Sequence, residues 1–81
     1  MPTIEVRLHA GLERYAPMGG GAAASFPLAV PDGGTVGDVL SHLGIPREAV
    51  HLIFVNGLAQ FLDSPLKEGD RLALFAPIGG G

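Results

Sequence analysis

The sequence has no cysteine, few charged residues and no long hydrophobic run. Without cysteine, the chain has neither a disulfide framework nor a thiolate nucleophile. Charged residues make up 16% of the chain, the formal net charge is −3, and the five basic residues are scattered along the sequence. This pattern excludes the dense basic stretch that typically binds nucleic acid. Because no apolar run approaches the ~20 residues that span a bilayer, we expect no contact with a membrane.

The chain does contain enough apolar sequence for one small core. Hydrophobic residues make up 47% of its 81 positions, which argues against intrinsic disorder. A chain of this length forms one domain and has little room for an internal substrate cavity. Its first ten residues alternate and carry charge, unlike a signal peptide. We therefore expect a cytoplasmic protein that is not itself an enzyme and holds no cofactor.

Two strands are predicted in the N-terminal part of the chain. Residues 3–9 alternate between apolar and polar side chains, as a half-buried strand does. Residues 25–30 form a second strand, which Pro27 confines to an edge of the sheet because proline has no N–H to donate. The Gly- and Ala-rich residues 10–24 predict a long, mobile connection between the two strands.

One helix is predicted from Val36 to Leu43. Its apolar residues recur at i, i+3, i+4 and i+7, which places them in a single stripe. Thr35 is a favourable N-cap, and Asp38 three residues later completes a capping-box pattern. Gly44 stands where a left-handed C-cap residue belongs. The helix therefore has a start signal, a buried face and a stop signal.

The C-terminal half predicts one short helical turn and three strands. The turn is expected at 46–50 and an apolar strand at 51–55, and the Asn-Gly that follows is a strong hairpin signal. A return strand at 58–61 and a last strand at 71–76 complete the order. The sequence thus predicts an α+β fold, a mixed sheet of about five strands with one main helix on one face.

Several segments of this pattern occur together in a known family. They are the first strand, "GTVGDVLSHLG", "FVNG", "LKEGDRLALFAP" and the terminal glycines. In this combination the chain resembles the ubiquitin-like sulfur carriers, which include the molybdopterin synthase small subunit and the thiamine-biosynthesis sulfur carrier. The "FAPI" lead-in and the long first loop look more like the molybdopterin branch. The third terminal glycine and the loop at 17–24 depart from the family pattern. The resemblance implies a β-grasp domain over 1–76 and a flexible Gly-rich tail over 77–81.

The tail "PIGGG" is predicted to carry the reactive group. The resemblance implies that a ubiquitin-activating-like enzyme uses ATP to adenylate the carboxylate of Gly81, and that sulfur then replaces the adenylate to leave a thiocarboxylate. Gly79 and Gly80 carry no Cβ that would obstruct approach to the carbonyl, and Pro77 stiffens the exit from the strand. The sulfur would pass to an acceptor such as a molybdopterin synthase large subunit, in molybdopterin-type cofactor biosynthesis.

Two other functions fit the same residues. A ubiquitin-like modifier would use the same adenylation to link its terminal glycine to lysines of target proteins, and Lys67 is the only lysine of this chain. A β-grasp interaction domain with incidental glycines would tolerate the loss of Gly80 and Gly81. The tail alone does not separate the carrier from the modifier.

Two phenylalanines are candidate partner-binding residues. If the neighbouring aliphatic residues face the helix, strand alternation sends Phe54 and Phe75 to the opposite, open face of the sheet. Ubiquitin-like proteins bind partners on this face, and an exposed apolar patch usually marks such a site. The surround would consist of Leu52, Ala73 and Ala59. The alternative is a locally shifted register that buries both rings.

Three further signals predict no chemistry. His9, His42 and His51 show no metal-ligand spacing, so we expect solvated histidines and no metal site. The run "GGGAAAS" at 19–25 lacks the Lys-Ser/Thr of a phosphate-binding loop. Ser25 lies in no nucleophile-elbow motif.

Overall fold

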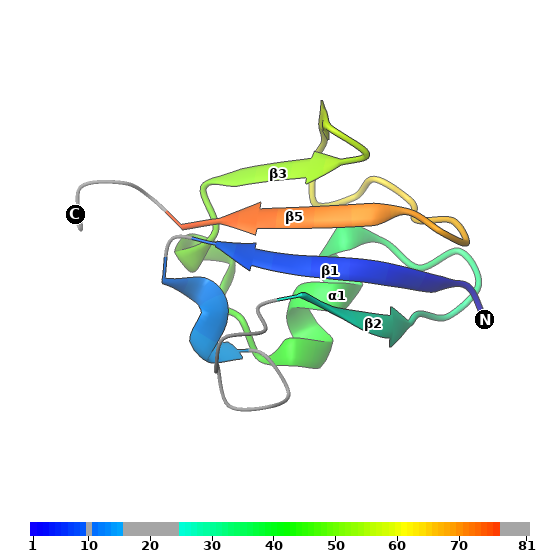
Figure 1. Ribbon diagram of the computed structural model, residues 1–81, viewed down its shortest axis with the longest axis horizontal. Coiled ribbons are helices and arrows are strands. Elements are labelled where there is room, and N and C mark those ends of the chain that lie inside the picture. The colour runs from blue at the N-terminus through cyan, green and yellow to red at the C-terminus, as the bar shows by residue number, and fades with distance from the viewer. Residues whose placement is uncertain (10, 16–24, 77–81) are drawn as a thin grey trace.

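The strands of the chain form one mixed sheet. The computed structural model describes residues 1–9, 11–15 and 25–76. Within them lie the strands β1 (Thr3–His9), β2 (Ser25–Ala29), β3 (Leu52–Val55), β4 (Leu58–Ala59) and β5 (Arg71–Phe75), the helix α1 (Val36–Leu43), and the 3-10 turns η1 (Leu12–Tyr15) and η2 (Arg47–Ala49). The strand order is β2-β1-β5-β3-β4, and α1 lies across one face of the sheet (Figure 1). This arrangement confirms the predicted α+β, β-grasp fold.

The first and last strands of the chain lie side by side in the middle of the sheet. β1 pairs antiparallel with β2 and parallel with β5, and β5 pairs antiparallel with β3. Pro27 lies in β2, at the sheet edge, as predicted. β5, the last strand before the C-terminus, is therefore hydrogen-bonded on both sides, to β1 and to β3.

Alternate residues of the central strands and one stripe of α1 make the core. The side chains with at most 2% exposure on these elements are Ile4, Val6 and Leu8 of β1, Leu72 and Leu74 of β5, and Val36, Val39 and Leu40 of α1. Burying one such aliphatic side chain contributes about 1.5–3 kcal/mol. The helix-facing side of the sheet is therefore fixed by strand alternation, and every other residue of β1 and β5 is directed to the open face.

Both ends of α1 are capped as the sequence predicts. The Thr35 hydroxyl accepts a hydrogen bond from the Asp38 N–H (3.4 Å), and the Asp38 carboxylate accepts one from the Thr35 N–H (2.9 Å). Gly44 ends the helix in the left-handed conformation, with φ of 75°. These two caps set the helix bounds at the predicted residues.

Removing the N-cap hydroxyl should weaken the fold measurably. We expect Thr35→Ala to lower the free energy of unfolding by about 1 kcal/mol, because the Asp38 N–H loses its side-chain acceptor. Thr35→Ser keeps the hydroxyl and is expected to stay within a few tenths of the wild type. Urea denaturation of both variants measures the difference. An equal loss in both would show that the cap does not stabilise the helix.

Two predicted segments differ from the structure. Within the stretch predicted to be an irregular connection, η1 forms, and its first residue, Leu12, is buried in the core at 2% exposure. A single leucine in a Gly- and Ala-rich stretch has no periodicity, so the prediction was wrong there. The return strand predicted at 58–61 is shorter in the structure, where β4 covers Leu58–Ala59. The chain turns after Ala59, and the Phe61 N–H donates a hydrogen bond to the Ser64 hydroxyl (3.1 Å).

No helix in the described part of the chain is long and apolar enough to cross a membrane.

Candidate functional site

β5 is the last strand before the C-terminal segment of the chain. Phe75, the last residue of β5, lies opposite His9 of β1, and its carbonyl oxygen accepts a hydrogen bond from the His51 N–H (2.7 Å). The structure describes one further residue, Ala76. The loop at 17–24 and the predicted tail residues lie outside the described residues; the latter are Pro77, Gly79, Gly80 and Gly81. The described part of the candidate site is therefore the sheet surface around the end of β5.

Three strands each place one aromatic ring on the open face of the sheet. The rings of Phe54 (β3) and Phe75 (β5) meet edge to face, with centroids 5.7 Å apart and planes at 89°. The imidazole of His9 (β1) stacks on the Phe75 ring, with centroids 4.5 Å apart and planes at 10°. All three side chains are half-buried. The contacts hold the rings in one continuous surface across β1, β5 and β3.

The predicted surround of these rings lies on the same face. Leu52 lies opposite Phe75 and is 42% exposed, and Ala73 lies opposite Phe54. Ala59 of β4 lies opposite Phe54 on its other side. We call this surface the aromatic patch; it consists of Leu52, Phe54, Ala59, Ala73, Phe75 and His9. The register that would bury both phenylalanines is not present, because Leu72 and Leu74 occupy the core side of β5.

The aromatic patch continues into a hollow of the open face. The hollow is lined by Glu5, Arg7, Phe54, Asn56, Gly57, Arg71, Leu72, Ala73 and Phe75. The sequence pattern predicts scattered basic residues and a solvated His9. Alternation along residues 3–9 could have placed Arg7 and His9 on the open face. The parallel pairing of β1 with β5, which brings them next to Arg71 and Phe75, has no local signal in the sequence. The fold therefore adds His9, Arg7 and Arg71 to the predicted site residues.

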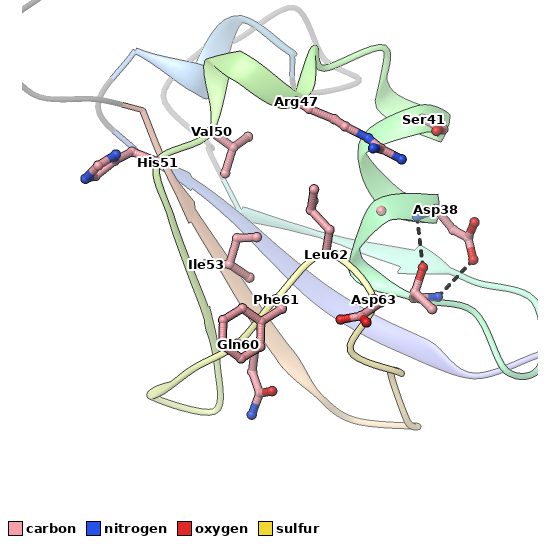
Figure 2. A pocket seen from close by; sticks show the side chains of 12 residues that line it. Asp38, Ser41, Arg47, Val50, His51, Ile53, Gln60, Phe61, Leu62 and Asp63 are labelled. Carbon is pink, nitrogen blue, oxygen red and sulfur yellow. Dashed lines mark hydrogen bonds between the residues drawn. The ribbon is translucent and has the colours of Figure 1, made fainter.

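A second concavity lies on the helix side of the molecule, between α1, η2 and residues 60–63 (Figure 2). Val50, Ile53 and Leu62 give it an apolar lining, and Phe61 at its border is 74% exposed. Figure 2 shows Arg47 extending from η2 toward α1, where the Asp38 carboxylate is already hydrogen-bonded in the helix cap. We call this concavity the helix-side groove. The sequence pattern does not predict this groove, because it places Phe61 in the return strand at 58–61, whereas β4 ends at Ala59.

The described side chains that line the two concavities form no metal-binding cluster. Among the residues that the structure describes, no three His, Asp or Glu side chains are arranged to hold a metal ion. His51 is exposed, and no described side chain that lines the helix-side groove forms a nucleophile–base hydrogen bond with it. The described surface offers apolar and charged contacts, which is the chemistry of protein recognition.

Comparison with known proteins adds a family and several structural relatives. The sequence model of the ThiS family matches residues 22–81. No curated protein matches the chain. Among solved structures, small archaeal modifier protein 1 of Haloferax volcanii is 26% identical, with 96% of this chain and 100% of that chain covered and a TM-score of 0.73.

Two further solved structures share the fold at lower identity. A proposed molybdopterin converting factor subunit 1 from Pyrococcus furiosus is 22% identical, with 96% and 100% of the two chains covered and a TM-score of 0.73. A chain in the complex of subunits 1 and 2 of molybdopterin-converting factor from Helicobacter pylori is 22% identical, with 98% and 99% covered and a TM-score of 0.60.

Proposed function

The chain belongs to the ThiS family, and from this membership we propose that it is a cytoplasmic sulfur carrier whose terminal Gly81 is converted to a thiocarboxylate. The observation that carries the proposal is that the family match runs through residue 81 and so includes all three glycines. The match includes α1, the Asn-Gly hairpin and β5 as well, so the fold and the tail support the same function.

The proposed chemistry takes place at the carboxylate of Gly81. A carboxylate oxygen attacks the α-phosphate of ATP on a partner enzyme, pyrophosphate leaves, and an acyl-adenylate forms. A sulfide nucleophile then attacks the carbonyl carbon, the carbon–sulfur bond forms, and AMP leaves with the oxygen that joined it to the carbonyl. The chain supplies the reacting carboxylate and no catalytic side chain. Glycine at this position leaves the carbonyl open to attack because it has no Cβ.

The aromatic patch is the proposed docking surface for the partner enzymes. Phe75 belongs to both the patch and β5, and it stands two positions before Pro77, where the tail begins. A partner that binds the patch therefore contacts the strand that leads into the tail. Since β5 is held between β1 and β3, docking on the patch fixes the end of β5, Phe75, relative to the partner. The remaining tail residues then have to reach only the partner's active site.

Molybdopterin-type cofactor biosynthesis is the pathway we propose for the sulfur. The fold likeness to chains named as molybdopterin converting factor subunits supports this choice, and the Helicobacter pylori structure contains subunits 1 and 2 together. By analogy, we propose that the acceptor is a larger second subunit of the molybdopterin synthase type. The chain then acts as the small, non-catalytic member of the pair.

A second function is favoured by one specific observation. The 26% identical Haloferax volcanii protein is named as a protein modifier. The acyl-adenylate is the shared intermediate, because the amine of a target lysine and a sulfide nucleophile attack the same carbonyl. What separates the two functions is therefore the nucleophile that the partner delivers.

Intact mass spectrometry tests the carrier function. We expect the purified chain, incubated with an enzyme that adenylates ThiS-family carriers, ATP and a sulfide donor, to gain the mass difference between sulfur and oxygen. Omission of ATP is expected to abolish the gain, because no acyl-adenylate forms. If a reference carrier is charged by the same enzyme preparation and this chain is not, the carrier function is wrong.

A blot of cell lysates separates the carrier from the modifier. For an N-terminally tagged carrier we expect one band at the monomer mass. A modifier instead gives a ladder of high-mass conjugates that disappears when Gly81 is deleted. Lys67→Arg is the matched control, because it removes the only lysine through which the chain could link to itself. A ladder that persists in Lys67→Arg and vanishes without Gly81 would replace the carrier by the modifier.

A further inference from the structure

Two arginines far apart in the sequence lie on the same hollow of the open face. Arg7 of β1 is paired with Ala73, and Arg71 of β5 is paired with Glu5, in the parallel ladder at the centre of the sheet. Both side chains are exposed, and both line the hollow together with Phe54 and Phe75. The hollow is thus bordered by guanidinium groups and, at the aromatic patch, by rings.

The acidic groups near these arginines form hydrogen bonds with other residues. Glu5 accepts a hydrogen bond from the Ser25 hydroxyl (2.9 Å). Asp70 accepts one from the Asn56 side-chain amide (3.0 Å) and one from the Lys67 N–H (2.8 Å). Within the described residues, neither guanidinium forms an ion pair or a side-chain hydrogen bond. Both arginines therefore present unpaired donors to whatever lies above the sheet.

The charged residues that line the hollow have a net charge opposite in sign to that of the whole chain. The chain has eight acidic and five basic residues, Lys and Arg counted together. Two of those five, Arg7 and Arg71, line the hollow, and Glu5 is the one acidic residue in its lining. Concentrating positive charge on one face of an acidic protein steers an acidic partner to that face.

We propose that the hollow receives a carboxylate side chain of the adenylating enzyme, bound by Arg7 and Arg71, while apolar residues of the enzyme pack on the aromatic patch. The inference rests on the proposed function and adds the chemistry of the partner surface. A guanidinium binds a carboxylate through two parallel hydrogen bonds. The occupant is a protein because Phe54, Ala73 and Phe75 line the same hollow, so a free anion would leave its apolar half uncovered.

The test is a binding measurement with an adenylating enzyme that charges the wild-type chain. The variant Arg7→Gln/Arg71→Gln removes both guanidinium groups from the hollow. The matched control Arg14→Gln/Arg47→Gln causes the same change in net charge with two exposed arginines that do not line the hollow. Association and dissociation rates are measured by surface plasmon resonance at several salt concentrations, and thermal unfolding shows that each variant is folded.

We expect the hollow variant to associate about tenfold more slowly than the wild type at low salt and to lose most of the salt dependence of the rate. The control is expected to stay close to the wild type. Arg7→Lys/Arg71→Lys keeps the charge but not the paired hydrogen bonds, so it should associate normally and dissociate faster.

The two possible failures are distinguishable. If the wild-type chain is converted to the thiocarboxylate but the hollow variant and the control bind the enzyme alike, the proposal that Arg7 and Arg71 bind a carboxylate of the enzyme is wrong. The carrier function then stands. If the hollow variant binds the enzyme normally but loses a millimolar affinity for inorganic phosphate, the hollow is an anion site and not a docking site. If no enzyme charges the wild-type chain, the carrier function fails and the inference fails with it.

Discussion

Deleting Gly80 and Gly81 is expected to abolish sulfur transfer and leave the unfolding temperature unchanged. The truncated chain still ends in a glycine carboxylate, that of Gly79, so its chemical class is preserved. Its reach is about 7 Å shorter, since an extended residue spans at most about 3.3–3.6 Å. The buried residues of β5 end at Leu74, so we expect the core to be intact. Complementation of a strain that lacks its own molybdopterin carrier measures the loss.

Gly81→Ala is the matched control for this truncation. It keeps the length of the tail and the carboxylate but adds a Cβ beside the reacting carbonyl. We expect partial activity, lower than wild type and well above the truncated chain, because steric obstruction slows attack without removing the group attacked. Full complementation by the truncated chain would show that the glycines are incidental and that the chain is a plain interaction domain.

Leu40→Ala and Phe75→Ala are expected to have opposite effects on folding and on binding. Leu40 is 1% exposed on the buried face of α1, and Leu→Ala at such a site costs about 2–5 kcal/mol. A small domain has about 5–15 kcal/mol of stability in total, so this variant is severely weakened. Its surface residues are unchanged, and the fraction that remains folded should bind partners normally.

Phe75→Ala should instead impair binding more than folding. The side chain is half-buried and contacts the His9 and Phe54 rings, so some stability is lost with these aromatic contacts, about 0.5–1.5 kcal/mol per pair. Truncating an aromatic anchor at an interface costs about 2 kcal/mol or more of binding energy, at least a twentyfold loss of affinity. Urea denaturation and the Kd for the adenylating enzyme measure the two effects.

Phe75→Leu controls for the loss of bulk. It retains an apolar side chain on the open face but not the ring that His9 stacks on, so its affinity should fall between those of the wild type and the alanine variant. If Phe75→Ala unfolds as readily as Leu40→Ala and binds the enzyme like the wild type, the aromatic patch stabilises the core and does not bind partners.

Local signals in the sequence predict the local parts of this fold. The bounds of α1 follow from Thr35 and Gly44, which act on their immediate neighbours through caps that the structure contains. The faces of β3 and β5 follow from simple alternation, which placed Phe54 and Phe75 together on the open face. The family resemblance, carried by segments along most of the chain, predicted the β-grasp architecture.

The parts that sequence reasoning missed depend on contacts between distant segments. The stacking of His9 on Phe75 and the joint position of Arg7 and Arg71 both require the β1–β5 pairing. That pairing joins opposite ends of the chain, and no turn or spacing specifies it. The burial of Leu12 likewise depends on core residues that are remote in sequence. The face on which a residue lies within its own strand was therefore predictable. Which residues of a neighbouring strand lie beside it was not.

Locating the transferred sulfur by fragment mass spectrometry tests the central claim most directly. The charged chain is digested after Arg71, which leaves a C-terminal peptide containing the whole tail. We predict that the added sulfur lies in this peptide, and that fragmentation assigns it to Gly81 and to no other residue. Sulfur found elsewhere in the chain, or a C-terminal peptide of unchanged mass in a preparation whose reference carrier is charged, would contradict the assignment of Gly81 as the carrier group.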